Sequence, residues 1–535
     1  MGAIGLMPRT LVFALFLIVF GIGGYLRFHG LTIRWDHSQK DKTSLLYRQF
    51  HMDEAVQGRK LGKLLDDGEY VYNPEDLHGP GLIYSTLPLA WIRGERTGAS
   101  LTDFTLRAIP AAYGVALLLL LWAWREELGN AALLGGGILF AVSPIMVYFS
   151  RYYIMEVPMV FWITVSMIAA WRYVKRPGYG WAILFGVAGG LTHMTKETGA
   201  ISFFTMAVAG AVVLLSHRHY LRTEGQHWKH LGASVGLGLL VSMIGFSVFF
   251  REPEAIWESI RTYFLYFERA EGSGHEKPWT HYLKILAWNR QPEGGPYWTE
   301  ALTLFFGAIG LVIAFTPAVK SLGDTIFWRW IGLYTILTAA IYAAIPYKTP
   351  WSMLCWVFTL MLMAGLGLAF LISLRRFYHV VPVIALLTFG WGLVDLSKQT
   401  KYSVTTFRAD YRNPFVYAHS PAKLIDLVRN VHDMAAVHPQ KKKLTIALCD
   451  KDVGWPLPWY FRAFPSLGLA KSLPSDFDVL RAQDVVIISP DYDAAMMEAT
   501  SETHAYETMY GIRDDLKVYN YVEKELYERF LDSRG

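Results

Sequence analysis

Two adjacent carboxylates, Asp53 and Glu54, open a polar segment that follows the apolar N-terminal run of residues 10–27. Neighbouring side chains on a helix point about 100° apart, so the two carboxylates cannot serve one spot equally. One of them could face a cavity and accept a proton, while the other orients a partner or a metal ion. The alternative is an ordinary helix start, where the helix dipole favours acidic side chains.

The residues after the acidic pair predict an amphipathic helix at the membrane surface. Apolar side chains fall roughly on one side, and cations such as Arg59 and Lys63 fall mostly elsewhere. This pattern is typical of a helix that lies in the interface with its cations near lipid phosphates. We therefore expect Arg59 to contact a lipid-borne phosphate.

Other charged or hydrogen-bonding side chains lie beside apolar segments. They occur in HGPG (78–81, with His78), SRYYIMEVP (150–158, with Arg151, Tyr152 and Glu156), THMTKETGA (192–200, with Lys196 and Glu197) and PYKTPW (346–351, with Tyr347 and Lys348). Ionisable residues at membrane depth are costly, and they mark functional sites by default. The alternatives are an interfacial aromatic and arginine belt at 151–153, a solvated turn at 196–197, a snorkelling Lys348 and a plain loop-to-helix turn at 78–81.

The composition predicts a polytopic α-helical membrane protein. Hydrophobic residues make up 53% of the 535 residues and charged residues 18%, where soluble domains carry about 25% charged residues. Membrane spans need about 20 mostly apolar residues. Eleven segments qualify: 10–27, 106–124, 132–149, 155–173, 180–194, 199–216, 232–250, 300–318, 326–345, 352–373 and 379–396. Residues 82–92 are apolar but short, which favours a re-entrant or interfacial piece.

Loop charges predict the orientation. With the N-terminus in the cytoplasm, the inside ends carry Arg9, Arg125, Arg172, Lys175, Arg176, Arg218, Arg222, Lys229, Lys320, Arg329, Arg375 and Arg376, and the short outside loops carry only Arg151, Lys196 and Lys348. We read the first run as an uncleaved signal anchor. The predicted domains are a transmembrane part, 1–396, with outside loops 28–105 and 251–299, and an extracytoplasmic α/β domain, 397–535.

The polar tail has an α/β pattern. KLTIALCD (443–450) and DVVIISP (484–490) are typical of buried strands, whereas 421–436 and the segment near 515–532 predict helices. Only two cysteines are present, one in an apolar segment and one in the tail, so a disulfide framework is not expected.

Four charged clusters fall on one predicted face of the membrane: residues 53–59, 151–156, 196–197 and Lys348. A carboxylate with three lone cations there suggests a cavity for an anionic lipid headgroup and a proton acceptor. His51, His78, Tyr152, Glu197 and Tyr347 are expected to line it. The net charge of +5 is modest and is explained by Lys and Arg in the cytoplasmic loops, so we expect no nucleic-acid partner. A divalent metal at Asp53 and Glu54 is the one cofactor the pattern allows, although two adjacent carboxylates do not complete a site.

The motifs also resemble a known family. HMDEAVQGRKL, HGPGLIY, SRYYIMEVP, TKET, PYKTPW, RNPFVYAHSP (412–421) and WPLPWYFR (455–462) are similar to GT-C membrane glycosyltransferases of the protein O-mannosyltransferase and aminoarabinose transferase type (glycosyltransferase family 39). The likeness is closer still to the "flippase activity-associated" membrane family of archaea and bacteria. WPLPWYFR is either an exposed patch that covers the site or a packed helix start.

The resemblance implies a glycosyltransferase with a polyprenyl-phosphate-linked sugar as donor and Asp53 as catalytic carboxylate. Under this hypothesis Asp53 is the general base in an inverting transfer to a protein or glycan acceptor outside the cytoplasm. Arg151, Lys196 and Lys348 stabilise the leaving phosphate, and Glu54, Glu156 and Glu197 orient the acceptor or those cations. The competing hypothesis is a non-enzymatic transporter of lipid-linked sugars, or its accessory subunit, in the plasma membrane.

Overall fold

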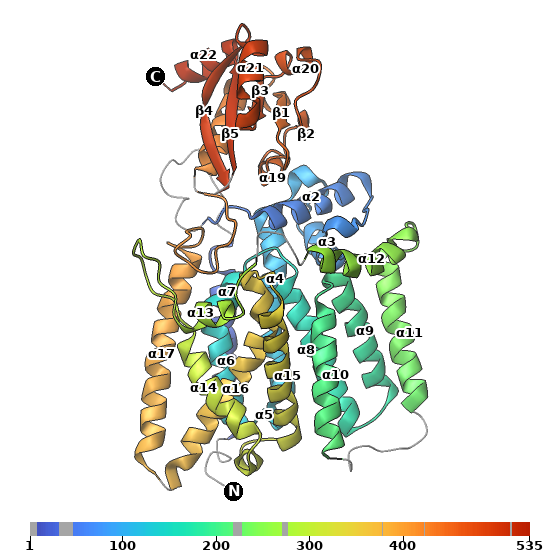
Figure 1. The fold of residues 1–535 in the computed structure, drawn as a ribbon, viewed down its shortest axis with the longest axis vertical. Helices are drawn as coiled ribbons and strands as arrows, with labels where there is room; N and C mark the ends of the chain where they lie inside the picture. The colour runs from blue at the N-terminus through green and yellow to red at the C-terminus, as the bar shows by residue number, and fades with distance from the viewer. Residues whose placement is uncertain are drawn as a thin grey trace. The chain divides into compact units, whose positions relative to one another are not determined.

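The computed structural model describes residues 8–31, 47–76, 78–217, 227–269, 276–376, 378–421, 423–513 and 516–534. Arg218 and Arg222 of the predicted inside cations therefore lie outside the described residues. The chain forms two compact units (Figure 1). Unit 1 comprises Met1–His29, Val71–Ser85 and Arg107–Val404, and unit 2 comprises Gly30–Tyr70, Thr86–Leu106 and Thr405–Gly535. Segments of the first long loop thus belong to the same unit as the C-terminal tail.

Unit 1 is helical. Its helices are α1 (Arg9–Phe28), α5 (Arg125–Leu128), α6 (Asn130–Val142), α7 (Pro144–Ser150), α8 (Glu156–Lys175), α9 (Tyr179–Thr195), α10 (Gly199–Leu215), α11 (His227–Phe246), α12 (Glu254–Arg269), α13 (His281–Ala287), α14 (Ala301–Ala314), α15 (Thr325–Ala344), α16 (Leu354–Ser373) and α17 (Val380–Val404). Helices α3 (Gly81–Ile92) and α4 (Asp103–Ala123) contribute residues to both units.

Each of the eleven predicted spans coincides with a helix, but the count of eleven spans is not confirmed. Among the described residues, seven helices are long and apolar enough to cross a membrane, and the pair α6 and α7, bent by 59°, can make an eighth. The other three, α9, α10 and α14, have 17, 17 and 14 residues. At a rise of about 1.5 Å per residue, helices of these lengths are shorter than the hydrocarbon core of a bilayer, which is about 30 Å thick. The apolar segment 82–92 forms the twelve-residue helix α3.

Small residues let the helices of unit 1 pack backbone to backbone. A Cβ added at Gly365 of α16 would come within 2.3 Å of the Ala132 carbonyl oxygen of α6. A Cβ at Gly367 would come within 2.1 Å of the Phe306 carbonyl oxygen of α14. Close approach through small residues is the usual way that helices associate in a membrane, where lipid removes the hydrophobic drive between them. Helix α16 is therefore the packing centre, and most of it is buried.

Unit 2 contains a five-stranded sheet in the order β2-β1-β3-β5-β4 (Figure 1). The strands are β1 (Ile446–Cys449), β2 (Leu467–Ala470), β3 (Val485–Ile488), β4 (His504–Arg513) and β5 (Leu516–Glu523), and the helices are α2 (Met52–Asp67), α18 (Leu424–Val437), α19 (Leu457–Tyr460), α20 (Asp478–Arg481), α21 (Asp493–Thr500) and α22 (Lys524–Asp532). Strands β2, β1 and β3 are parallel, and β5 and β4 form an antiparallel hairpin at one edge. Leu480 of α20 and Met496 of α21 pack on one face of the sheet.

The predicted strands at 443–450 and 484–490 and the predicted helix at 421–436 are confirmed by β1, β3 and α18. The helix predicted near 515–532 is wrong in its first half, because Leu516–Glu523 is strand β5. That stretch is rich in Val and Tyr, which suit a half-buried pleated surface, and it pairs with β3 on one side and β4 on the other. Only Lys524–Asp532 is helical.

Candidate active site

The acidic pair lies in the first turn of α2, as predicted, and its N-terminus is closed by a capping box. The His51 Nδ1 atom accepts a hydrogen bond from the Asp53 backbone N–H at 3.1 Å. The Glu54 carboxylate accepts one from the His51 backbone N–H, also at 3.1 Å. This reciprocal pattern satisfies orphan donors of the helix start. The local sequence therefore determines where α2 begins and how the two carboxylates are directed.

The two carboxylates have different surroundings. Glu54 is fully buried, and both of its oxygens accept hydrogen bonds from Arg48, at 2.7 and 2.9 Å. Asp53 keeps 31% of its side chain exposed. Its carboxylate lies 3.6 Å from His51 Nδ1, and this contact is not an ion pair, because that nitrogen accepts the Asp53 backbone N–H. Glu54 is thus a structural carboxylate neutralised by Arg48, whereas the Asp53 carboxylate is open to solvent. Asp53 is therefore the member of the pair that is able to take a proton.

The surroundings of Glu54 do not favour a metal site at this pair. A divalent cation needs several oxygen ligands, whereas both Glu54 oxygens already bind the Arg48 guanidinium. The described part of the chain holds no group of three or more His, Cys, Asp or Glu side chains arranged to bind a metal. We assign no step to a metal ion.

Helix α2 packs tightly on the WPLPWYFR segment, which is a packed helix start and not an exposed patch. A Cβ at Gly58 would come within 2.8 Å of the Trp459 ring. Trp459 is 1% exposed and stacks on Phe50, with ring centroids 4.9 Å apart. The Tyr460 hydroxyl accepts from the Phe50 backbone N–H at 2.9 Å. These contacts fix the residues just before Asp53, so the segment positions the carboxylate indirectly.

A basic cavity of about 340 Å³ opens beside the same helix. Its charged lining consists of Arg59, Lys60, Lys63, Arg462, Asp66 and Asp67. Arg59 and Lys63 are exposed, whereas Arg462 lies over the Trp459 ring at 3.7 Å and burial lowers the pKa of its guanidinium. Four cations against two carboxylates make this a suitable cavity for an anionic group. It contains Arg59, the predicted phosphate ligand.

In unit 1, Glu156 and Lys196 form a buried ion pair. Glu156 begins α8 and Lys196 follows α9, and the two side chains are almost completely inaccessible to solvent. The Lys196 Nζ donates to Glu156 Oε1. The structure thus joins two predicted site residues 40 positions apart, at the end of the bundle where α8 begins and α9 ends. A phosphate that binds Lys196 must share its ammonium with Glu156.

The HGPG turn brings His78 to Glu197 at the same end of the bundle. His78 Nδ1 lies 3.5 Å from Glu197 Oε2, and Glu197 is buried. The two glycines are needed for packing, because a Cβ at Gly79 would lie 2.1 Å from the Met194 carbonyl oxygen of α9 and one at Gly81 would also approach Met194 closely. The turn is therefore both a loop-to-helix connection and the element that positions His78.

Replacing Gly79 by alanine should destabilise unit 1 by about 1–3 kcal/mol, the usual cost of overpacking. The new Cβ meets backbone atoms, which cannot rotate away. The fraction of full-length protein that stays monodisperse on heating would measure this. Gly24→Ala is the matched control, since its Cβ meets nothing within 4 Å. Equal thermal midpoints for the two variants would contradict the predicted contact.

Arg151 and Tyr152 have structural surroundings in unit 1. Arg151 Nη1 donates to the carbonyl oxygens of Leu26, Arg27 and His29, at the C-terminal end of α1. A cation there interacts favourably with the helix dipole. The Tyr152 hydroxyl lies 3.2 Å from that of Tyr148, and its side chain is buried. These contacts account for the burial of both side chains, so the phosphate role of Arg151 stays a prediction.

Lys348 is the buried member of a cationic cluster that the sequence pattern did not indicate. It is 1% exposed and donates to the Ile345 carbonyl oxygen, and burial lowers the pKa of its ammonium. The pKa of His281 is lowered mainly by burial, and further by the positive charges of Lys277, Lys348 and Lys284. Tyr347 pairs with Glu276 through an isolated β-bridge, which brings the PYKTPW loop to the second long loop. This bridge and the hydrogen bond from the Lys277 backbone N–H to the Pro346 carbonyl oxygen, at 3.0 Å, bring the cations of the two loops together.

Two comparisons relate the chain to known proteins. Residues 15–252 match the family model described as dolichyl-phosphate-mannose-protein mannosyltransferase. ArnT from Cupriavidus metallidurans bound to undecaprenyl phosphate is similar over 97% of this chain and 98% of its own, with 15% identity and a TM-score of 0.59. The archaeal oligosaccharyltransferase AglB from Archaeoglobus fulgidus, in complex with an inhibitory peptide and a dolichol-phosphate, is similar over 98% and 77%, with 13% identity and a TM-score of 0.53.

The fold of this chain is therefore that of the GT-C membrane glycosyltransferases ArnT and AglB. None of the curated proteins matches it in sequence. The matched family segment includes α2, the HGPG turn, Glu156 and Lys196, so it carries most of the predicted site residues. Lys348 and the sheet of unit 2 lie beyond it. The GT-C fold and the multi-pass membrane character predicted from the sequence are confirmed.

Proposed function

We propose that this protein transfers a sugar from a polyprenyl-phosphate-linked donor to a protein or glycan acceptor outside the cytoplasm, with Asp53 as general base. The observation that carries the proposal is the division of the acidic pair. Arg48 neutralises Glu54, while Asp53 stays partly exposed next to the His51 ring. The likeness to ArnT with undecaprenyl phosphate and to AglB with dolichol-phosphate supports the class of donor.

The proposed reaction is a single displacement at the anomeric carbon. Asp53 takes the proton of an acceptor hydroxyl as the oxygen attacks, the bond from sugar to phosphate breaks, and polyprenyl phosphate leaves. Attack from the face opposite the phosphate inverts the anomeric centre. The leaving phosphate needs charge stabilisation more than a proton. Lys348 and its neighbouring cations, and Lys196 through its shared ammonium, are the proposed donors of that charge.

In this proposal Arg59 binds the lipid-borne phosphate from the basic cavity beside α2. Arg59→Gln should therefore raise the KM for the donor about tenfold with little change in kcat, because the contact is present in ground and transition states alike. Donor titrations with a fixed acceptor would measure this. Lys471→Gln, an exposed cation of unit 2 outside the cavity, is the control. A lower kcat at unchanged KM would contradict the role of Arg59 in binding.

The direct test uses purified protein, a radiolabelled polyprenyl-phosphate sugar and a membrane extract as the source of acceptor. The expected result is label on a product that no longer partitions with the lipid, together with released polyprenyl phosphate. Persistent labelling of the lipid alone, across several donor sugars, would count against transferase activity.

A further inference from the structure

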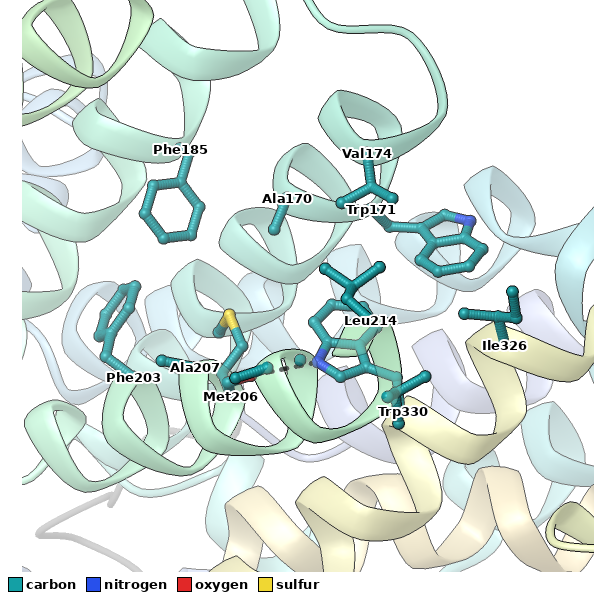
Figure 2. Close-up of a pocket in the computed structure, with 13 residues that line it drawn as sticks. Ala170, Trp171, Val174, Phe185, Phe203, Met206, Ala207, Leu214, Ile326 and Trp330 are labelled. Carbon is teal, nitrogen blue, oxygen red and sulfur yellow. Dashed lines mark hydrogen bonds between the residues drawn. The ribbon is translucent and has the colours of Figure 1, made fainter. Parts of the chain in front are cut away.

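Unit 1 contains an apolar crevice far along its helices from the buried Glu156–Lys196 pair. The crevice has a volume of about 250 Å³ (Figure 2). Its walls come from the last turns of α8, from Phe185 of α9, from residues 203–214 of α10 and from the start of α15. Glu156 begins α8 and Lys196 follows α9. The crevice therefore extends along the middle of these helices toward their opposite end, and none of its lining residues is among the site residues described above.

The lining is hydrocarbon and aromatic. Figure 2 shows Trp171 and Trp330 on one side of the crevice and Phe185 and Phe203 on the other. The two indole rings are stacked, with centroids 6.0 Å apart. Apolar cavities of this kind stay dry and accept apolar guests. Exposed Ala207 and Ala211 of α10 belong to the lining, so the crevice is open at the surface of the bundle, where a hydrocarbon chain can enter.

Arg329, Lys175 and His217, here called the rim, each lie within three residues in sequence of a residue that lines the crevice. Arg329 is adjacent to Trp330 on α15, and its Nη1 lies 3.2 Å from His217 Nε2, just after the end of α10. Lys175 lies over the Trp171 ring at 4.9 Å, but its ammonium already pairs with Asp324 at 2.5 Å. Arg329 has no carboxylate partner within ion-pair distance among the described residues, and its Nε has no hydrogen-bond partner there. The rim thus retains a positive charge.

We propose that this crevice binds one acyl chain of an anionic glycerophospholipid, with the Arg329 guanidinium holding its phosphate. A dry hydrocarbon crevice beside an uncompensated guanidinium matches a molecule that joins an acyl chain to a phosphate. A plain belt of interfacial cations would not need an apolar crevice next to it. The proposal is independent of the sugar-transfer reaction, because none of its residues belongs to the candidate active site.

The test is native mass spectrometry of the purified full-length protein, titrated with phosphatidylglycerol or with phosphatidylcholine of the same acyl chains. The expected result is that one phosphatidylglycerol molecule binds about tenfold more tightly than phosphatidylcholine, which is the effect expected of one charge-assisted hydrogen bond. Arg329→Gln should abolish the preference without weakening phosphatidylcholine binding. Ala207→Leu, which fills the crevice, should weaken both. Lys320→Gln and Ala340→Leu, exposed positions outside the crevice, should change neither.

A photoreactive phosphatidylglycerol on the unaltered protein provides a second readout that does not depend on any variant folding. Cross-links should map to residues 203–214 of α10. Equal binding of the two lipids to the wild type, or an unchanged preference in Arg329→Gln, would overturn the proposal. Displacement of phosphatidylglycerol by an equal concentration of polyprenyl phosphate would also overturn it, since the crevice would then belong to the donor lipid.

Discussion

Asp53→Asn should lower the rate of sugar transfer by about 10²–10⁴-fold, the range for loss of a positioned general base. Asparagine is nearly isosteric but cannot accept the proton of the acceptor. The Asp53 side chain makes no hydrogen bond within the described part of the chain, and its backbone N–H to His51 is untouched by the substitution. The change should therefore leave α2 folded. Donor affinity should also persist, because the phosphate is bound by cations.

Single-turnover transfer and donor binding should be measured on the same preparations. Glu69→Gln is the control, an exposed acid just after α2 that lines no cavity described above. Transfer by Asp53→Asn at the wild-type rate would remove Asp53 as the base. Loss of donor binding together with transfer would assign it to the binding of substrate instead.

Removing one partner of the Arg48–Glu54 pair should destabilise the start of α2 by about 3–5 kcal/mol, because a buried charge is left uncompensated. Glu54→Gln removes the charge that faces the Arg48 guanidinium, and Arg48→Met removes the two guanidinium hydrogen bonds from the Glu54 carboxylate. The double variant should recover a large part of the loss, since neither position then carries a buried charge. The coupling between the two sites is the quantity that the double-mutant cycle isolates.

Hydrogen–deuterium exchange over residues 50–61 would measure this locally. Each single variant should exchange faster by roughly two to three orders of magnitude, if opening of α2 limits exchange. Asp478→Asn is the control, because its partner Arg481 is exposed and such pairs contribute about 0–1 kcal/mol. Additive effects of the two single changes would contradict a direct pair.

The sequence predicts the helices of this protein well because their signals are local. Apolar runs mark the spans, and the acidic residues just after His51 mark the start of α2. The strand β5 was mistaken for helix because its pairing with β3 and β4 is not a local property. The count of eleven spans is not confirmed for a related reason, since composition indicates an apolar helix but not whether the helix is long enough to cross the bilayer.

The site residues that sequence reasoning missed are those joined by tertiary contacts. Arg48 lies in a stretch without periodic pattern, so nothing local indicates that it pairs with Glu54. His281 and its neighbouring lysines meet Lys348 only because two distant loops pair. Arg151 also makes tertiary contacts that its sequence pattern does not indicate, because its Nη1 donates to carbonyl oxygens at the end of α1.

The most direct test of the proposed function separates transfer from transport in one experiment. Sealed vesicles containing the protein would be loaded with a polyprenyl-phosphate donor labelled in its sugar, and the acceptor extract would be added. Sugar transfer predicts that label becomes covalently attached to a non-lipid acceptor and that one polyprenyl phosphate is released for each sugar attached. Movement of the intact labelled lipid between leaflets, with no released polyprenyl phosphate, would contradict it and favour a transporter.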